Sequence, residues 1–326
     1  MRKTPYIPSS DLKTIMHSKR ANIYYLEHCR VLLNGGRVEY VTDEGRESLY
    51  WNIPIANTSC LLLGSGTSIT QAAMRELSKA GVMVGFCSGG GTPLFNGTEA
   101  EIGCEFFSPQ SEYRPVMYLQ QWCKFWFDDE KRLAVAKALQ QQRLALLEPV
   151  WSKLEWVYSC EKLTALVTQY QHEFAQAAHS QALLAAEGRL TTKLYALANQ
   201  ATMNEPDFKR SERGKSIDLV NQFLDHGNYL AYGLGATACW VLGLPHGLAV
   251  LHGKTRRGGL VFDAADIIKD SMILPQAFIS AQNGDSEKEF RQACIQNLLR
   301  FGALDIIIER LQQLALQGAS DEYFAG

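Results

Sequence analysis

Residues 243–254 read Gly-Leu-Pro-His-Gly-Leu-Ala-Val-Leu-His-Gly-Lys, and a basic and then an acidic segment follow them directly. The basic segment is Thr255-Arg256-Arg257, and the acidic one ends in Asp263-Ala264-Ala265-Asp266 and Lys269-Asp270. An imidazole together with carboxylates outlines a site for a hard divalent cation. Cations beside such a site suit a phosphodiester held by the metal ion. The stretch therefore predicts metal-assisted chemistry on a phosphate ester.

The acidic end of this stretch predicts a helix that begins at Asp263. Ala264–Ile268 favour a helix, so Asp263 is a natural N-cap, with Asp266 three residues further on. Asp270 then shares the face of Asp263 and Asp266. Acidic residues in a first turn are ordinarily explained by the helix dipole, but Asp270 lies too deep for that. Whether Asp263 binds metal or caps the helix stays open.

The segment Leu244–Lys254, followed eleven residues after His252 by Asp-x-x-Asp-x-x-Lys, resembles the signature of a known family. That family is the CRISPR-associated adaptation integrase, the first-numbered Cas protein. Its pattern also has an upstream Glu-Gly, which this chain supplies at Glu187-Gly188. The resemblance implies that Glu187, His252 and Asp266 bind the metal ion, with Asp263 as a further catalytic residue beside them. Without the resemblance, Glu187 is an ordinary solvated helix glutamate.

The resemblance implies a function, a cofactor and partners. The function is insertion of foreign DNA fragments as spacers, in which a 3′-hydroxyl attacks a phosphodiester of the CRISPR repeat; with water the same site hydrolyses DNA. The cofactor is Mg²⁺ or Mn²⁺, and the imidazole favours Mn²⁺. The partners are double-stranded DNA fragments, the repeat and a second copy of the chain. Similarity to subtype I-F adds a second adaptation protein fused to a helicase-nuclease.

Basic residues are the candidates for DNA contact. A formal net charge of −2 is unfavourable for a chain that binds DNA over its whole surface, so the cations must cluster locally. They do so around the signature and in the charged segment Phe208–Lys215, which is otherwise a solvated linker. The candidates are Lys254, Arg256, Arg257, Lys269, Lys209, Arg210 and Arg213.

Composition is ordinary for a soluble globular protein, and the family resemblance implies the prokaryotic cytoplasm as its location. Hydrophobic residues make up 46% and charged residues 20% of 326 residues, which is enough for two domains with sizeable cores. Eight cysteines show no CxxC spacing, and Met1–Pro5 lacks an apolar leader. Tyr229–Leu251 is long enough to cross a bilayer, but Gly243 and Pro245 interrupt it, so a buried core helix is expected.

The order of secondary-structure signals predicts an α+β multidomain fold. Residues 1–108 are expected to form a mainly β domain, which in the similar family mediates dimerisation. Its signals are a hairpin at Asn34-Gly35-Gly36 and a helix that begins after Thr70 and ends at Gly81. Residues 109–326 are expected to form a larger, all-α catalytic domain. The division places the whole predicted metal site in the helical part.

Within the helical part, the periodicity predicts helices over 115–126 and 130–150 and either two helices, or one interrupted near Gly188, over 163–202. The aromatic residues Tyr118, Trp122, Phe125 and Trp126 have helical spacing, which is typical of a core and less often of a surface that stacks bases. Ser286-Glu287-Lys288-Glu289 is a capping box that opens a helix used for packing.

Two other functions fit the same residues. One is a catalytically silent subunit that holds DNA or assembles a complex. The other is a metal-dependent nuclease for branched or damaged DNA that acts without CRISPR arrays. Substitution of the three expected ligands separates the first from an integrase, and product analysis separates the second.

Overall fold

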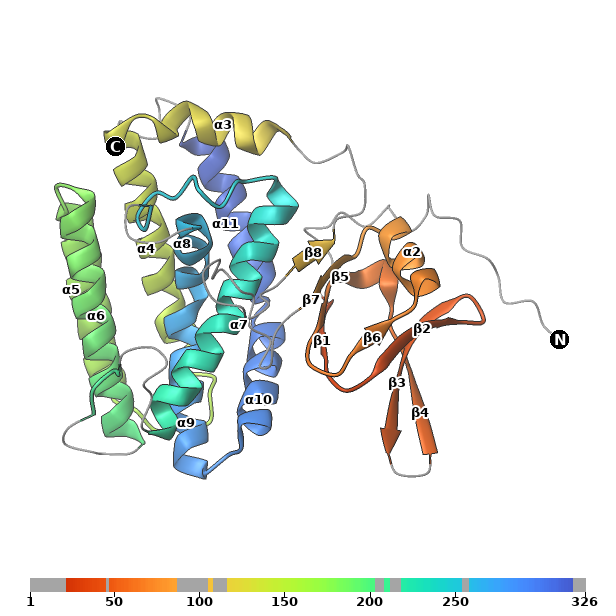
Figure 1. Ribbon diagram of the computed structural model, residues 1–326. Helices are drawn as coiled ribbons and strands as arrows, with labels where there is room; N and C mark the ends of the chain where they lie inside the picture. Colours follow the sequence, from red (N-terminus) through yellow and green to blue (C-terminus); the bar gives the residue numbers. More distant parts are fainter. Residues whose placement is uncertain are drawn as a thin grey trace. The chain divides into compact units, whose positions relative to one another are not determined.

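The computed structural model describes residues 22–44, 47–86, 105–107, 116–202, 208–211, 218–253 and 258–318. The chain divides into two compact units, Met1–Arg114 and Pro115–Gly326. The first is rich in strands and the second is helical, which confirms the predicted fold class (Figure 1). The predicted domain boundary between residues 108 and 109 falls outside the described residues.

The first unit contains two four-stranded sheets. In one, the strand order is β1-β5-β7-β8, with the first three strands parallel and β8 antiparallel to β7. In the other, the order is β4-β3-β2-β6, with antiparallel pairs except for β6, which is parallel to β2. The strands are β1 Asn22–Leu26, β2 Arg30–Asn34, β3 Arg37–Glu44, β4 Glu47–Asn52, β5 Thr58–Leu63, β6 Ser68–Ile69, β7 Met83–Phe86 and β8 Glu105–Phe107, with a 3₁₀ turn, η2, at Ile55–Asn57.

Local sequence signals account for the turns of this unit. Gly35 and Gly36 connect β2 to β3 with φ of +55° and +82°, a conformation that favours glycine, so the predicted hairpin is confirmed. The helix α2, Gln71–Lys79, begins after Thr70, whose side chain accepts a hydrogen bond from the backbone N–H of Ala73. Gly81, with φ of +71°, follows the end of α2 as predicted.

The second unit consists of helices. They are α3 Val116–Trp126, α4 Asp129–Trp151, α5 Cys160–Gln176, α6 Ser180–Ala201, α7 Leu219–Leu242, α8 Gly259–Ile268, α9 Leu274–Asn283, α10 Glu287–Arg300 and α11 Ala303–Gln317, and a π-helical turn, η3 at Lys269–Ile273, joins α8 to α9. Figure 1 shows α5 and α6 side by side, and α4 packs against both. The opposite side of α4 packs against α8 and η3, so α4 connects the α5–α6 pair to the core of the unit.

The helix α7 lies in the core of this unit. It packs against α8, α9 and α11, and most of its residues are buried. It ends at Gly243, whose φ of +69° is a left-handed cap. The long apolar stretch is thus a buried helix that stops where the sequence predicted. In the described ranges, no helix combines the length and the apolar character that a bilayer crossing needs.

Two sequence predictions about this unit have different outcomes. Trp122 and Phe125 are fully buried, which confirms the core interpretation for these two aromatic residues, whereas Tyr118 and Trp126 are partly exposed. Of the two alternatives for residues 163–202, two helices is confirmed, and an interruption near Gly188 is wrong, because the break between α5 and α6 lies at residues 177–179 and Gly188 is inside α6. Glycine lowers helix stability but does not end a helix whose neighbouring turns are Ala- and Leu-rich.

Candidate metal centre

Asp263 holds the loop that carries His252. Its Oδ2 accepts hydrogen bonds from the backbone N–H groups of Val250 (2.7 Å) and Leu251 (3.1 Å). Its Oδ1 accepts from the backbone N–H of His252 (3.0 Å) and contacts the Nδ1 of the same residue (2.8 Å). The carboxylate is buried. Four hydrogen bonds to one buried carboxylate fix the direction of the imidazole.

The prediction that Asp263 caps a helix is wrong. Helix α8 begins at Gly259, after Gly258 in the left-handed conformation, so Asp263 lies in the second turn. The reason is a tertiary contact, because the carboxylate accepts hydrogen bonds from N–H groups of the preceding loop instead of those of its own helix. Leu260–Phe262, which has strand character by sequence, forms the first helical turn because its apolar side chains are buried there.

The imidazole of His252 points its second nitrogen toward Asp266. Because Nδ1 donates to Asp263, Nε2 is the basic nitrogen of the neutral ring, and it lies 3.8 Å from Asp266 Oδ2. Burial lowers the pKa of His252, but the hydrogen bond to Asp263 and the carboxylates of Asp266, Asp263 and Glu187 outweigh burial and raise the pKa above the usual 6.5. The carboxylate of Glu187 therefore acts on His252 through its charge.

Asp266 is buried beside a lysine. Its Oδ1 lies 2.5 Å from the Nζ of Lys269, and only 3% of its side chain is exposed. Burial raises the pKa of Asp266, but the positive charges of Lys269, His252 and Arg143 outweigh it and lower the pKa to about 2. Asp266 is therefore a carboxylate at any physiological pH, the form that a metal ion requires.

Glu187 is held by an arginine that the sequence analysis missed. Arg143, on α4, donates from Nη1 to Glu187 Oε1 (2.7 Å) and from Nη2 to Thr191 Oγ1 (2.6 Å). Its Nε donates to Asp270 Oδ2 at 2.8 Å, and Nη2 also contacts that oxygen. The signal was present: Arg143 lies between Leu139 and Leu147 on the buried face of α4, and a charge in an apolar stripe needs a buried partner.

Asp270 is thus the partner of an arginine. Both side chains are almost completely buried, at 1% and 2% exposure. Burial lowers the pKa of Arg143, but Asp270 and Glu187 outweigh it and raise the pKa, so the guanidinium stays charged. The backbone oxygen of Asp270 also accepts a hydrogen bond from Trp151 Nε1 (3.1 Å).

The donor set suits Mg²⁺ or Mn²⁺. Glu187 and Asp266 offer carboxylate oxygens, and His252 offers a nitrogen whose ring is oriented by a second carboxylate, as is usual for metal-binding histidines. Two ligands about 2.1 Å from one ion lie at most about 4.2 Å apart, and the 3.8 Å between Nε2 and Oδ2 is within that limit. Among the described residues, however, no three His, Cys, Asp or Glu side chains form a ready group for a metal ion.

The carboxylates are neutralised by protein cations in this arrangement. Lys269 holds one oxygen of Asp266, and Arg143 holds one oxygen of Glu187. In each case the second oxygen makes no hydrogen bond to the part of the protein that the structure describes. The predicted ligand set therefore stays a prediction, with one oxygen of each carboxylate available.

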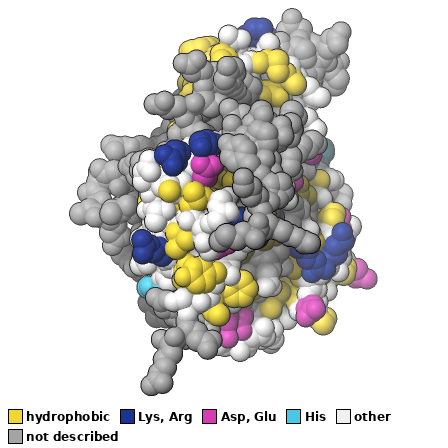
Figure 2. All heavy atoms as spheres, turned by 90° about the vertical axis from the view of Figure 1, so that its right-hand side faces the viewer, with side chains coloured by type: hydrophobic (Ala, Val, Ile, Leu, Met, Phe, Trp, Pro, Cys, Tyr) yellow, Lys and Arg dark blue, Asp and Glu magenta, His cyan; other side chains and the backbone are white. Residues whose placement is uncertain are grey.

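The predicted DNA-contact residues have different surroundings. Lys269 is 15% exposed beside Asp266, and Lys209 is exposed. Arg210 donates to Asn221 Oδ1 (2.7 Å) and pairs with Asp225, so it also ties its segment to α7. The predicted contacts Lys254, Arg256, Arg257 and Arg213 lie outside the described residues. On the face drawn in Figure 2, basic side chains occur in small separate groups with acidic ones nearby.

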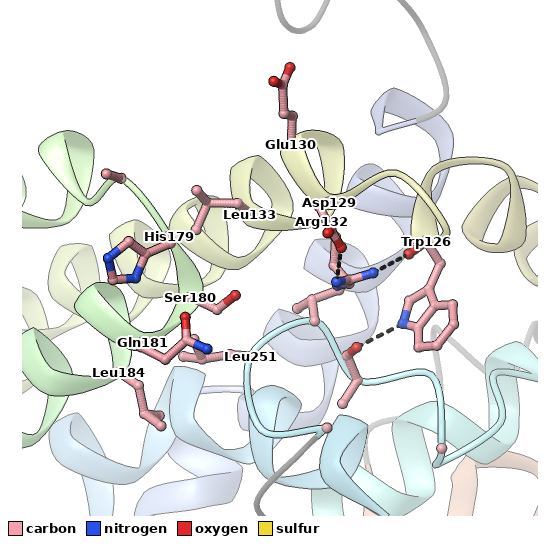
Figure 3. A pocket seen from close by; sticks show the side chains of 15 residues that line it. Trp126, Asp129, Glu130, Arg132, Leu133, His179, Ser180, Gln181, Leu184 and Leu251 are labelled. Carbon is pink, nitrogen blue, oxygen red and sulfur yellow. Dashed lines mark hydrogen bonds and ion pairs between the residues drawn. The ribbon is translucent and has the colours of Figure 1, made fainter.

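A cavity of about 520 Å³ lies beside the loop that carries His252. It is lined by the start of α4, the start of α6 and five residues of the loop, which are Gly247, Ala249, Val250, Leu251 and Gly253 (Figure 3). Trp126 supports the loop by donating from Nε1 to the Ala249 oxygen at 2.7 Å. Arg132 in turn donates to the Trp126 oxygen (2.7 Å) and pairs with Asp129.

The sequence matches the family of "CRISPR associated protein Cas1" over residues 25–313, most of the chain. The chain belongs to the Cas1 family. It is 60% identical to a "CRISPR-associated endonuclease Cas1" of Pectobacterium atrosepticum, over 94% of this chain and 95% of the relative. A "CRISPR-associated endonuclease Cas1" of Pseudomonas aeruginosa is also 60% identical, over 95% of this chain and 97% of the relative.

Solved structures share the fold of this Cas1 chain. A TtCas1–DNA complex superposes with a TM-score of 0.61 and 22% identity, covering 90% of both chains. A casposase bound to an integration product superposes with a TM-score of 0.66 and 13% identity, covering 91% of this chain and 90% of the casposase chain. A chain of a Cas6-RT-Cas1–Cas2 complex superposes with a TM-score of 0.65 and 13% identity, covering 92% of this chain and 35% of that longer chain.

Proposed function

We propose that this Cas1 chain is a metal-dependent DNA integrase of CRISPR adaptation, which also hydrolyses DNA when water replaces the attacking hydroxyl. The observation that carries the proposal is the approach of His252 Nε2 to Asp266 Oδ2 at 3.8 Å, with the imidazole oriented by Asp263 and the charge of Glu187 acting on the same ring. Relatives at 60% identity that are named as endonucleases support the nuclease chemistry. The casposase with its integration product supports strand joining on this fold.

Glu187, His252 and Asp266 would hold Mg²⁺ or Mn²⁺, which supplies Lewis-acid activation of a phosphodiester. In the joining reaction, a 3′-hydroxyl of the fragment forms a new P–O bond and the bond to the departing strand breaks. The departing 3′-oxygen takes up a proton, so the number of phosphodiester bonds is conserved. Asp263 keeps the proton of His252 on Nδ1, and Lys269 adds a positive charge beside Asp266 that attracts the phosphate.

The proposed partners follow from the same comparisons. DNA fragments and the CRISPR repeat are the substrates, with phosphate contacts from Lys209, Arg210 and Lys269 and from the basic residues outside the described ranges. The complex that contains Cas1 and Cas2 supports a second adaptation protein as partner. We place the chain in subtype I-F, in which that partner is fused to a helicase-nuclease.

We also propose that the chain forms a homodimer through its strand-rich unit. Strand β4 is at the edge of its sheet and exposes Tyr50 (57%) and Trp51 (50%). Tyr40 stacks on Trp51, with ring centroids 6.4 Å apart. An exposed aromatic pair on an edge strand is suited to association with another chain.

The test is strand joining in vitro with Mn²⁺, a DNA fragment that carries 3′-hydroxyls and a plasmid with a repeat. Glu187→Gln, His252→Ala and Asp266→Asn are each expected to reduce joined product about 100-fold or more. Asp129→Asn, which changes a carboxylate whose side chain is 86% exposed, is the control and should join at the parental rate. Parental rates in all three ligand variants contradict the proposal, and shortened strands without joined product favour a nuclease.

A further inference from the structure

Arg143 connects the element that carries Glu187 to the element that carries Asp266. Its helix α4 packs against α6 on one side and against α8 and η3 on the other. The guanidinium contacts Asp270 with two of its nitrogens, and these contacts come from η3, one turn beyond Asp266. The third nitrogen, Nη1, donates to Glu187 on α6. One rigid planar group thus sets the distance between the two ligand-bearing elements.

The two carboxylate oxygens of Glu187 have different contacts. Oε1 accepts from Arg143 at 2.7 Å and lies 3.4 Å from Thr191 Oγ1. Thr191 is itself fixed, because it accepts from Arg143 Nη2 and donates to the backbone oxygen of Glu187 at 3.1 Å. Oε2 has no hydrogen bond to any described residue, and 15% of the side chain is exposed. Within the described part of the chain, the carboxylate is therefore held through Oε1 alone.

We propose that Arg143 is the positioning residue of the metal centre: it holds Oε1 of Glu187 so that Oε2 is directed toward the ion shared with His252 and Asp266. The proposal rests on the proposed function, since it requires Glu187 to be a ligand. A glutamate side chain has three rotatable bonds, and an unheld one spends most of its time away from any single ligand position. Hydrogen bonds to a ligating carboxylate are a known means of raising metal affinity.

Two other roles make different predictions. If Arg143 only joins helices, a folded variant binds metal as the parent does. If Arg143 competes with the ion for Glu187, removal of the guanidinium tightens metal binding. A positioning role requires weaker binding in a folded protein, so the sign of the change decides.

The experiment measures Mn²⁺ affinity of the full chain by titration calorimetry and by the electron paramagnetic resonance of free Mn²⁺, without DNA. Arg143→Lys keeps the positive charge but loses the planar set of N–H donors that contacts Glu187 and Asp270 together. We expect a 10- to 100-fold loss of Mn²⁺ affinity. Arg143→Gln combined with Asp270→Asn removes both charges of the fully buried pair together and should show the same loss. Arg189→Gln on α6, an arginine that is 55% exposed, is the matched control and should bind as the parent.

Folding is followed by near-ultraviolet circular dichroism and urea midpoints. Thr191→Val removes the hydroxyl between Arg143 and Glu187 and carries the test should the arginine variants not fold; a several-fold loss of affinity is expected. Unchanged or tighter Mn²⁺ binding in a folded variant overturns the inference. Glu187→Gln distinguishes failure of the positioning role from failure of the proposed function. If Glu187→Gln binds Mn²⁺ with parental affinity, Glu187 is not a ligand. If Glu187→Gln binds weakly but Arg143→Lys binds with parental affinity, only the positioning role of Arg143 is overturned.

Discussion

Replacing Asp263 with asparagine tests the central feature of the site, the buried carboxylate that organises the loop around His252. Four donors face its two oxygens, from Val250, Leu251 and both the backbone and the ring of His252. Asparagine keeps one oxygen and replaces the other with an NH₂ group, which cannot accept. Whichever way the amide turns, two of the four donors lose their acceptor in a buried place.

The magnitude follows from these contacts. Each hydrogen bond to a charged group contributes roughly 1.5–3 kcal/mol, so two lost bonds cost about 3–6 kcal/mol. Relief of the buried charge offsets part of that cost. We expect a net loss of about 3 kcal/mol, which for a domain of this size lowers Tm by roughly 6–12 °C. The pKa of His252 should also fall, because the carboxylate that raises it is gone.

Urea denaturation gives the change in unfolding free energy, and NMR titration of the imidazole gives the pKa of His252. Asp129→Asn is the control: its carboxylate is 86% exposed and pairs with Arg132, so its loss should cost less than about 1 kcal/mol. An Asp263→Asn protein within 1 kcal/mol of the parent, or with an unchanged His252 pKa, would refute the account of this carboxylate.

Three further predictions concern packing, association and charge. Gly188→Ala should raise the unfolding free energy by about 0.5–1 kcal/mol, because its Cβ enters open space; Gly235→Ala should lower it by about 1–3 kcal/mol, because its Cβ would lie 2.6 Å from a backbone oxygen of α8. Urea midpoints check both, and equal shifts contradict the packing. Trp51→Ser should weaken the proposed dimer in sedimentation without changing the circular dichroism; an unchanged dimer excludes β4 as the interface. Lys269→Met should destabilise the metal-free protein by about 3 kcal/mol, because Asp266 loses its buried counter-ion. Mn²⁺ should then raise the Tm of this variant more than that of the parent, because the metal ion supplies the missing positive charge beside Asp266. An equal rise in Tm would mean that the metal ion does not replace the lysine charge.

Features determined by neighbouring residues could be predicted from the sequence. The hairpin at Gly35-Gly36, the cap at Thr70, the end of α7 at Gly243 and the capping box of Ser286 and Glu289 all occur as expected. In each case the backbone conformation or the hydrogen bond involves residues at most a few positions apart. Such interactions are the same in a peptide and in a fold.

Features determined by tertiary partners could not be predicted from local patterns. Asp263 has the sequence context of an N-cap, but its partners are N–H groups of residues 250–252, which only the folded loop brings to it. Arg143 was missed because its acceptors come from two other segments, although its place on the buried face of α4 was visible. The ligand set came from family resemblance, since spacing alone does not distinguish Glu187 from a solvated glutamate.

The long sequence separation of these contacts has a consequence during synthesis of the chain. Arg143 and Asp270 are 127 residues apart, and Asp270 comes after α4, α5, α6, α7 and α8 in the chain. At ribosomal speeds of about 5–20 residues per second, roughly 6–25 s pass between the emergence of the two side chains. Throughout that interval the nascent chain contains Arg143 without Asp270, the carboxylate that pairs with it in the folded protein. The proposed metal centre can therefore assemble only after the ribosome has passed Asp270.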